Sequence, residues 1–233
     1  MSENIKKTTK AFRVDLDSRE NQSMLKPSTP PFSNQAYQAY QVNEAAEKIH
    51  ELIKNARYSN DNIVLNHNEI KEAFFSPFKP QLKNAQVFLS HSHADRNKAL
   101  EVKDYLENQT ERKVFIDSLF WDYKDDVLNK LEKHDDISKI KDAFTLILRE
   151  SLQDMIEKCP YFVFLQSKNS VSNQGLSRIT YSAWIYEELK IAHSISTISE
   201  SHLIPMMESM QVFHDISPFL KSFETITLNE LSQ

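Results

Sequence analysis

The chain has 233 residues, 40% hydrophobic and 26% charged, which is enough apolar material for one ordinary globular domain with an extension. The formal net charge of -5 lacks the basic excess of a nucleic-acid-binding protein, so no nucleic-acid partner is expected. A single glycine, Gly175, excludes the glycine-rich phosphate loops of the Walker and dinucleotide-binding motifs. A single cysteine, Cys159, excludes an internal disulfide and a multi-cysteine zinc site.

No run of residues approaches the roughly 20 apolar positions of a membrane span, and the polar N-terminus lacks the apolar core of a secretory signal. We therefore expect no membrane partner and a cytoplasmic location.

The first 80 residues precede the pattern of the main domain. Residues 1–40 are rich in polar side chains, with three prolines between positions 27 and 31, and are predicted to be a mostly disordered arm. Residues 41–80 are predicted to be a helical extension, with one helix over 42–56 and a shorter one over 68–75. This pair either mediates oligomerisation or partner binding, or packs on its own domain, and the spacing does not decide between the two.

Residues 86–230 alternate short apolar runs with amphipathic helices, which predicts an α/β domain. Strands are expected at 87–89, 114–116, 161–165, 203–206 and 225–228, and helices from about 95, over 140–156 and over 181–195. This order predicts a flavodoxin-like, five-stranded parallel sheet with helices on both faces. Ligands of such folds bind at the carboxyl ends of the strands, so Ser90, His91, Ser92 and His93 should line the crevice.

Glu188 is the most anomalous residue of the chain. At 100° per residue, the apolar arc of the helix over 181–195 runs through Tyr181, Trp184 and Leu189. Glu188 falls inside that arc, whereas Glu187 falls well outside it. A carboxylate on a core-facing stripe is costly unless it is paired or faces a cavity. Glu188 therefore either carries a function or sits at the edge of the stripe, bonded to a basic side chain.

A single carboxylate suits one particular cleavage reaction. Ordinary glycosidases need two carboxylates, because a poor leaving group must be protonated. Nicotinamide bound to ribose is already cationic and departs neutral, so it needs no general acid. One carboxylate that holds the ribose hydroxyls and offsets the oxocarbenium-like charge can then supply most of the catalysis.

Four segments resemble the bacterial Toll/interleukin-1 receptor (TIR) domains. Val87–Asp95 (VFLSHSHAD) is similar to their first strand and loop, and Val114–Ser118 (VFIDS) to their second strand. Tyr161–Asn169 resembles the strand that enters the catalytic helix, and Ser182–Leu189 (SAWIYEEL) resembles the family's Ser-x-Trp-x-x-x-Glu-Leu segment. The resemblance covers about residues 86–230 and implies a TIR fold.

In NAD-cleaving members the glutamate of that segment is catalytic, so the resemblance implies that Glu188 is the catalytic residue of an NAD glycohydrolase or ADP-ribosyl cyclase. The products would be nicotinamide and ADP-ribose, or a cyclic or conjugated ADP-ribose signal in antiphage immunity. NAD is then the substrate, with no cofactor or metal, and a downstream effector could read the product. Self-association through the TIR domain is also implied.

The matching positions supply the remaining site residues. Ser90, His91 and Ser92 are expected to contact phosphates or ribose, and Trp184 to stack on a base or wall the pocket, unless it is a buried core aromatic. Asp117–Tyr123, including Trp121, is expected to form a mobile, substrate-binding loop after the second strand. Asp95 is more simply a helix N-cap.

Two other functions fit parts of the sequence. His91-x-His93-x-Asp95 after an apolar strand resembles the first metal motif of the metallo-β-lactamase fold, but Arg96 stands where that motif continues with histidine. A catalytically silent TIR adaptor is the second alternative, although an adaptor has no evident need for an acid on the apolar arc.

Overall fold

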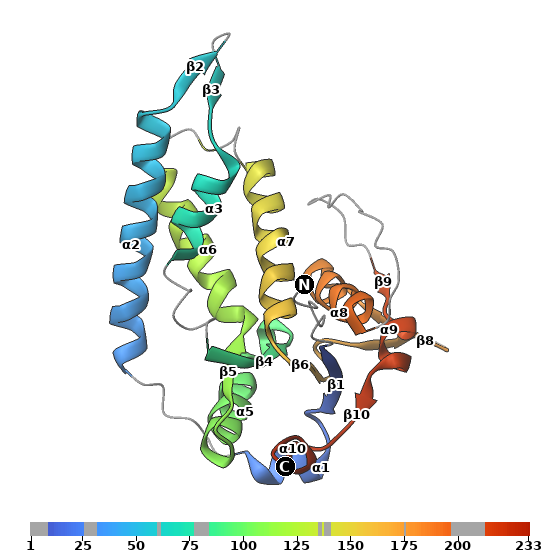
Figure 1. Ribbon diagram of the computed structural model, residues 1–233. Helices are drawn as coiled ribbons and strands as arrows, with labels where there is room; N and C mark the ends of the chain where they lie inside the picture. The colour runs from blue at the N-terminus through green and yellow to red at the C-terminus, as the bar shows by residue number, and fades with distance from the viewer. Residues whose placement is uncertain are drawn as a thin grey trace, which may run out of the picture. The chain divides into compact units, whose positions relative to one another are not determined.

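The computed structural model describes residues 9–25, 32–59, 62–76, 84–134, 137, 141–174, 176–196 and 213–233. The chain divides into two compact units, whose elements are shown in Figure 1. The sheet unit comprises Met1–Ser28, Asn84–Ser118 and Gln153–Gln233. The helical unit comprises Thr29–Lys83 and Leu119–Leu152.

The sheet unit is built on five parallel strands in the order β10-β1-β6-β4-β5. Their bounds are β1 Lys10–Asp15, β4 Ala85–Ser90, β5 Lys113–Ile116, β6 Tyr161–Gln166 and β10 Glu224–Thr225. Strands β4 and β6 are almost continuously apolar and buried, as parallel strands covered on both faces should be. The predicted α/β class and flavodoxin-like parallel five-stranded sheet are confirmed.

An N-terminal segment forms β1, the strand that lies between β6 and β10. β1 pairs with β6 along its whole length and with β10 on its other side, and Val14 and Leu16 are fully buried. The prediction of a disordered arm over residues 1–40 is therefore wrong for Lys10–Met24, which form β1 and helix α1 (Arg19–Met24). The strand predicted at 203–206 lies outside the described residues. The last predicted strand is shorter than expected, because Leu228 begins helix α10 (Leu228–Leu231).

Helices cover the sheet on two sides. Helix α5 (Arg96–Gln109), which follows the short turn η2 (His93–Asp95), packs on β5 and near α10 and α1. Helix α8 (Ala183–Ser196) packs on β1 and on α9 (Ser217–Ser222), on the other side of the strands (Figure 1). A small antiparallel sheet, with β7 Ser172–Gln174, β8 Ser177–Thr180 and β9 His214–Asp215, leads into and out of this region.

The helical unit contains α2 (Phe32–Lys54), α3 (His67–Phe75), most of α6 (Asp117–Leu131) and most of α7 (Lys141–Lys158), with the hairpin β2 (Arg57–Ser59) and β3 (Asn62–Val64). Its core gathers around the fully buried Phe74, whose ring lies 5.2 Å from Tyr123 and 5.9 Å from Phe144 between centroids. Thus the extension does not simply precede the sheet; it is inserted in sequence between β1 and β4.

Both helices predicted within residues 41–80 are present, and they pack on each other. Val42, Ala45 and Ile49 of α2 and Ile70 of α3 are buried. Burial of these apolar faces favours the interpretation that the pair packs within its own unit. None of the helices in the described residues is long and apolar enough to cross a membrane.

Candidate functional site

The site lies at the carboxyl ends of β4 and β5. Leu89 of β4 is in register with Ile116 of β5, so the residues that follow these two positions emerge at the same edge of the sheet. Ser90 is the last residue of β4, His91 follows it, and Asp117 directly follows β5. The parallel pairing therefore brings together three polar residues from segments more than 20 positions apart.

Helix α8 supplies the fourth member, Glu188. The helix begins after Ser182, whose Oγ accepts the N–H of Ile185 at 3.2 Å and so caps the first turn. Glu188 is fully buried, and the hydroxyl of Ser90 donates a hydrogen bond of 2.5 Å to its Oε2. Glu188 is thus turned inward onto the end of β4, and it does not lie at the solvent edge of its helix.

Asp117 is the partner of His91. Its Oδ1 accepts the backbone N–H of Ser118 at 2.7 Å. The Nδ1 atom of His91 lies 3.1 Å from the same Oδ1, a distance that allows an ion pair, although the approach is outside hydrogen-bond geometry. We call Ser90, His91, Asp117, Ser118 and Glu188 the buried acid cluster.

Burial dominates the electrostatics of this cluster. It raises the pKa of the Asp117 carboxyl above its ordinary value, because a charge there would have lost its water. The His91 imidazole, the contact with Glu188 and the backbone N–H groups of Ser118 and His91 lower that pKa and oppose the rise only in part. Two further polar atoms, His91 Nε2 and Ser118 Oγ, are buried without a hydrogen-bond partner in the part of the chain that the structure describes.

Other residues predicted for the site are not all gathered here. Ser92 is half-buried at the start of η2, where its carbonyl accepts the N–H of Asp95 at 2.8 Å. Trp184, one turn before Glu188 on α8, is partly exposed, so it is not a fully buried core aromatic.

The predicted mobile loop over Asp117–Tyr123 is wrong, since these residues form the first two turns of α6. Tyr123 belongs to the helical unit, where it is buried and its hydroxyl donates to the carbonyl of Phe74 at 2.8 Å. The Tyr123 hydroxyl, which was expected to contact substrate, is thus engaged in a hydrogen bond within the helical unit. Trp121 lies on the same helix, and its side chain is outside the described residues.

Two expectations about α8 need correction. Glu187, placed outside the apolar arc, is also buried, with its Oε1 3.8 Å from the Nζ of Lys190. Tyr181, placed inside the arc, precedes the helix and is 54% exposed. Because α8 packs on β1, β8 and α9, it buries more of its circumference than one stripe.

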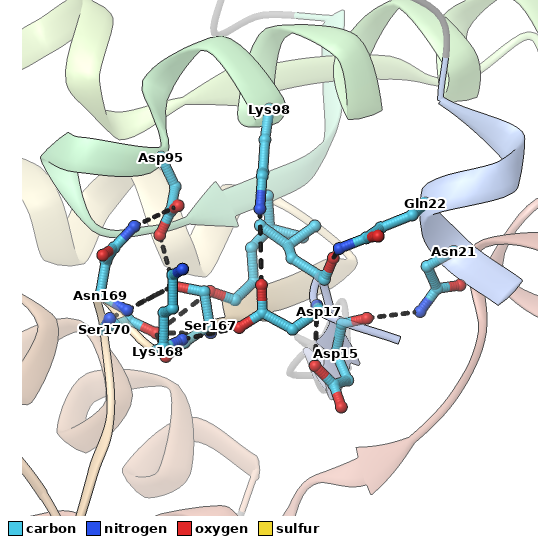
Figure 2. A network of polar contacts seen from close by, with 12 residues as sticks. Asp15, Asp17, Asn21, Gln22, Asp95, Lys98, Ser167, Lys168, Asn169 and Ser170 are labelled. Atoms are coloured by element: carbon cyan, nitrogen blue, oxygen red, sulfur yellow. Dashed lines mark hydrogen bonds and ion pairs between the residues drawn. The ribbon is translucent and has the colours of Figure 1, made fainter. Parts of the chain in front are cut away.

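A second polar arrangement at the same edge of the sheet was not predicted. Asp95 makes no capping bond; its carboxylate accepts the hydroxyl of Ser167 and the amide of Asn169, both from the loop after β6 (Figure 2). Asp17, in the loop after β1, accepts the N–H of Lys168 at 2.8 Å and lies 3.5 Å from Lys98 Nζ. We call these six residues the Asp95 network; no sequence pattern pointed to it, because its bonds join residues more than 70 positions apart.

Neither arrangement resembles a metal centre. Within the described ranges, no three His, Cys, Asp or Glu side chains lie close enough together to hold a metal ion. His91 faces Asp117, His93 is exposed and Asp95 binds Ser167, so the three positions of the metallo-β-lactamase-like motif diverge.

Comparison with known proteins leaves the site to be interpreted from its own residues. No family model, curated protein or solved structure matches this chain.

Proposed function

We propose that the sheet unit is a TIR-like domain that cleaves the bond between nicotinamide and ribose in NAD, with Glu188 as its catalytic carboxylate. The observation that carries the proposal is the full burial of Glu188, whose Oε2 accepts the Ser90 hydroxyl, at the carboxyl ends of β4 and β5, where His91 and Asp117 also meet. Folds of this class bind their ligands at that edge. Asp117, a buried acid beside the His91 imidazole, has a raised pKa, and acids with shifted pKa values are frequent at functional sites.

The proposed chemistry requires one carboxylate. As nicotinamide departs neutral, positive charge develops on the ribose, and a carboxylate in a site of low dielectric constant stabilises that charge far more than it would in water. Ser90, which holds Glu188 Oε2, would keep the carboxylate oriented. Trp184, one turn away and partly exposed, would contact a base or the nicotinamide ring.

In this conformation the catalytic carboxylate is closed to solvent, since Glu188 has no exposed surface. NAD must therefore reach it through an opening of the cluster, and we propose that self-association of the chain in the cytoplasm favours the open form. This step agrees with the assembly that the TIR resemblance implies. The product would be ADP-ribose or a cyclic or conjugated form of it, which an effector in antiphage immunity could read.

The test is to incubate the full chain with NAD over a range of protein concentrations and to identify the products by liquid chromatography and mass spectrometry. We expect nicotinamide together with an ADP-ribose product, and a rate lower by roughly 10²–10³-fold in Glu188→Gln. The matched control is Glu187→Gln, which makes the same change at a neighbouring buried position of the same helix and should retain the wild-type rate.

Two outcomes would overturn the proposal. If wild type and Glu188→Gln are equally inactive at every concentration, the domain is an interaction module. If both are equally active, NAD is cleaved elsewhere on the chain.

A further inference from the structure

Two side chains of the buried acid cluster have polar atoms that no hydrogen bond satisfies. His91 is 3% exposed, and neither of its ring nitrogens makes a hydrogen bond within the described residues. Ser118 is 1% exposed, and among the same residues its Oγ also has no hydrogen-bond partner. Most buried polar side chains in folded proteins are hydrogen-bonded, so two exceptions in one cluster need an explanation.

The same oxygen atom of Asp117 meets both residues. Asp117 Oδ1 accepts the backbone N–H of Ser118 at 2.7 Å, and His91 Nδ1 lies 3.1 Å from it. Nδ1 therefore faces a carboxyl group, and Nε2, at the opposite side of the ring, is left to meet a ligand. A histidine with one ring nitrogen beside a carboxyl group and the other available is suited to proton transfer. His91 also directly follows Ser90, whose hydroxyl holds Glu188 Oε2.

A partner that satisfies these atoms must both donate and accept hydrogen bonds. A neutral imidazole with its proton on Nδ1 accepts at Nε2, and the Ser118 hydroxyl can donate. A water molecule meets both requirements, and water is also the reactant that hydrolysis of NAD requires. Departure of nicotinamide leaves a cationic ribose carbon, C1′, which a water oxygen must attack before ADP-ribose can form.

We propose that His91 is the general base of this second step, and that His91 Nε2 and Ser118 Oγ hold the water that attacks C1′. This inference rests on the proposed function of Glu188. As the water oxygen forms its bond to C1′, one of its O–H bonds breaks and the proton passes to Nε2, which later releases it to solvent. The overall reaction converts NAD and water into nicotinamide, ADP-ribose and one proton. His91 thereby directs the site toward hydrolysis, with ADP-ribose as the product.

Exchange of isotopically labelled nicotinamide into NAD separates bond cleavage from attack by water. Exchange requires the bond to nicotinamide to break and re-form and consumes no water, whereas formation of ADP-ribose consumes one water molecule. We expect His91→Gln to form ADP-ribose roughly 10²-fold more slowly than wild type and to keep the exchange rate within about threefold. His134→Gln, the same change at an exposed histidine, should leave both rates unchanged. Glu188→Gln should lose both.

Ser118→Ala provides a milder second variant, since it removes only one hydroxyl group. It should slow the formation of ADP-ribose by roughly 10-fold, the effect of one hydrogen bond to the attacking water, with exchange again unchanged. Both rates are expressed per folded molecule, measured by circular dichroism, because replacing a buried histidine can lower the stability of the chain.

The outcomes separate this inference from the proposed function. If wild type neither releases nor exchanges nicotinamide, the proposed function is wrong and this inference falls with it. If both rates depend on Glu188 but fall together in His91→Gln, or stay at the wild-type level in both His91→Gln and Ser118→Ala, the function stands and the role of His91 is wrong. Formation of cyclic ADP-ribose alone by wild type would likewise overturn the role of His91 and leave the function of Glu188 standing.

Discussion

The buried acid cluster and the Asp95 network lie at the carboxyl ends of strands of one sheet, yet they are built in opposite ways. In the network, each acid meets donors: Asp95 accepts from Ser167 and Asn169, and Asp17 accepts from Lys168 and approaches Lys98. In the cluster, two acids, Asp117 and Glu188, are buried, and His91 Nε2 and Ser118 Oγ have no hydrogen-bond partner within the described residues. Buried polar groups that are hydrogen-bonded hold their loops in place, whereas buried polar groups without such bonds call for an explanation, of which a catalytic role is one.

The largest change in stability is expected from breaking the network at its centre. Asp95→Ala leaves the hydroxyl of Ser167 and the amide of Asn169 without their acceptor, which should lower the free energy of unfolding by about 1–3 kcal/mol. Urea denaturation followed by circular dichroism measures this loss as a lower midpoint with an unchanged slope. Asp104→Ala, an exposed position of the same helix, should stay within about 0.5 kcal/mol of wild type.

A smaller change in the free energy of unfolding, one that depends on pH, is expected from the buried acid cluster. Burial raises the pKa of Asp117, so above the ordinary pKa of an acid the folded chain holds a proton that the unfolded chain has released. The stabilising contribution of this proton is full at low pH and is lost as pH rises through the raised pKa. We expect the free energy of unfolding to fall over that window by up to about 1.4 kcal/mol per pH unit for one proton, and to fall less steeply in Asp117→Asn.

Urea midpoints at a series of pH values measure that slope. A slope equal in wild type, Asp117→Asn and the exposed control Asp126→Asn would contradict a raised pKa at Asp117.

The smallest effect is expected at the solvent side of the network. Lys98 Nζ lies 3.5 Å from Asp17, and both side chains are more than a third exposed. Water screens such a pair, so Lys98→Ala should change the unfolding free energy by less than about 0.5 kcal/mol. A loss as large as that of Asp95→Ala in the same urea series would show that the network depends on its charges and not on its buried hydrogen bonds.

The parts of the fold that could be predicted are those whose local sequence has a clear apolar pattern. β4, β5 and β6 are short, nearly continuous apolar runs, and α8 carries apolar residues at helical spacing, so all four were predicted. β1 was missed because Lys10, Arg13 and Asp15 interrupt its apolar residues, and only its pairing with the distant β6 and β10 shows that it is a strand.

The residues of the candidate site could be predicted where the local sequence alone identifies them. Glu188 was singled out as an acid on an apolar arc and Ser90 and His91 by their position at a strand end, whereas Asp117 was a candidate through the resemblance to TIR domains. Tyr123 was misplaced because α6 begins at once after β5, with no loop between them. The hydrogen bond of Ser90 to Glu188 and the bonds of Asp95 join distant segments, so they require the folded chain.

The central claim, that the acid cluster is the reactive arrangement and the Asp95 network the structural one, is tested most directly by one measurement. Nicotinamide release from NAD, expressed per folded molecule, is compared between Glu188→Gln and Asp95→Ala in the same assay. The claim predicts a loss of roughly 10²–10³-fold in Glu188→Gln and a near wild-type rate in the folded fraction of Asp95→Ala. Release by Glu188→Gln at the wild-type rate, or an equal loss in both variants, would contradict it.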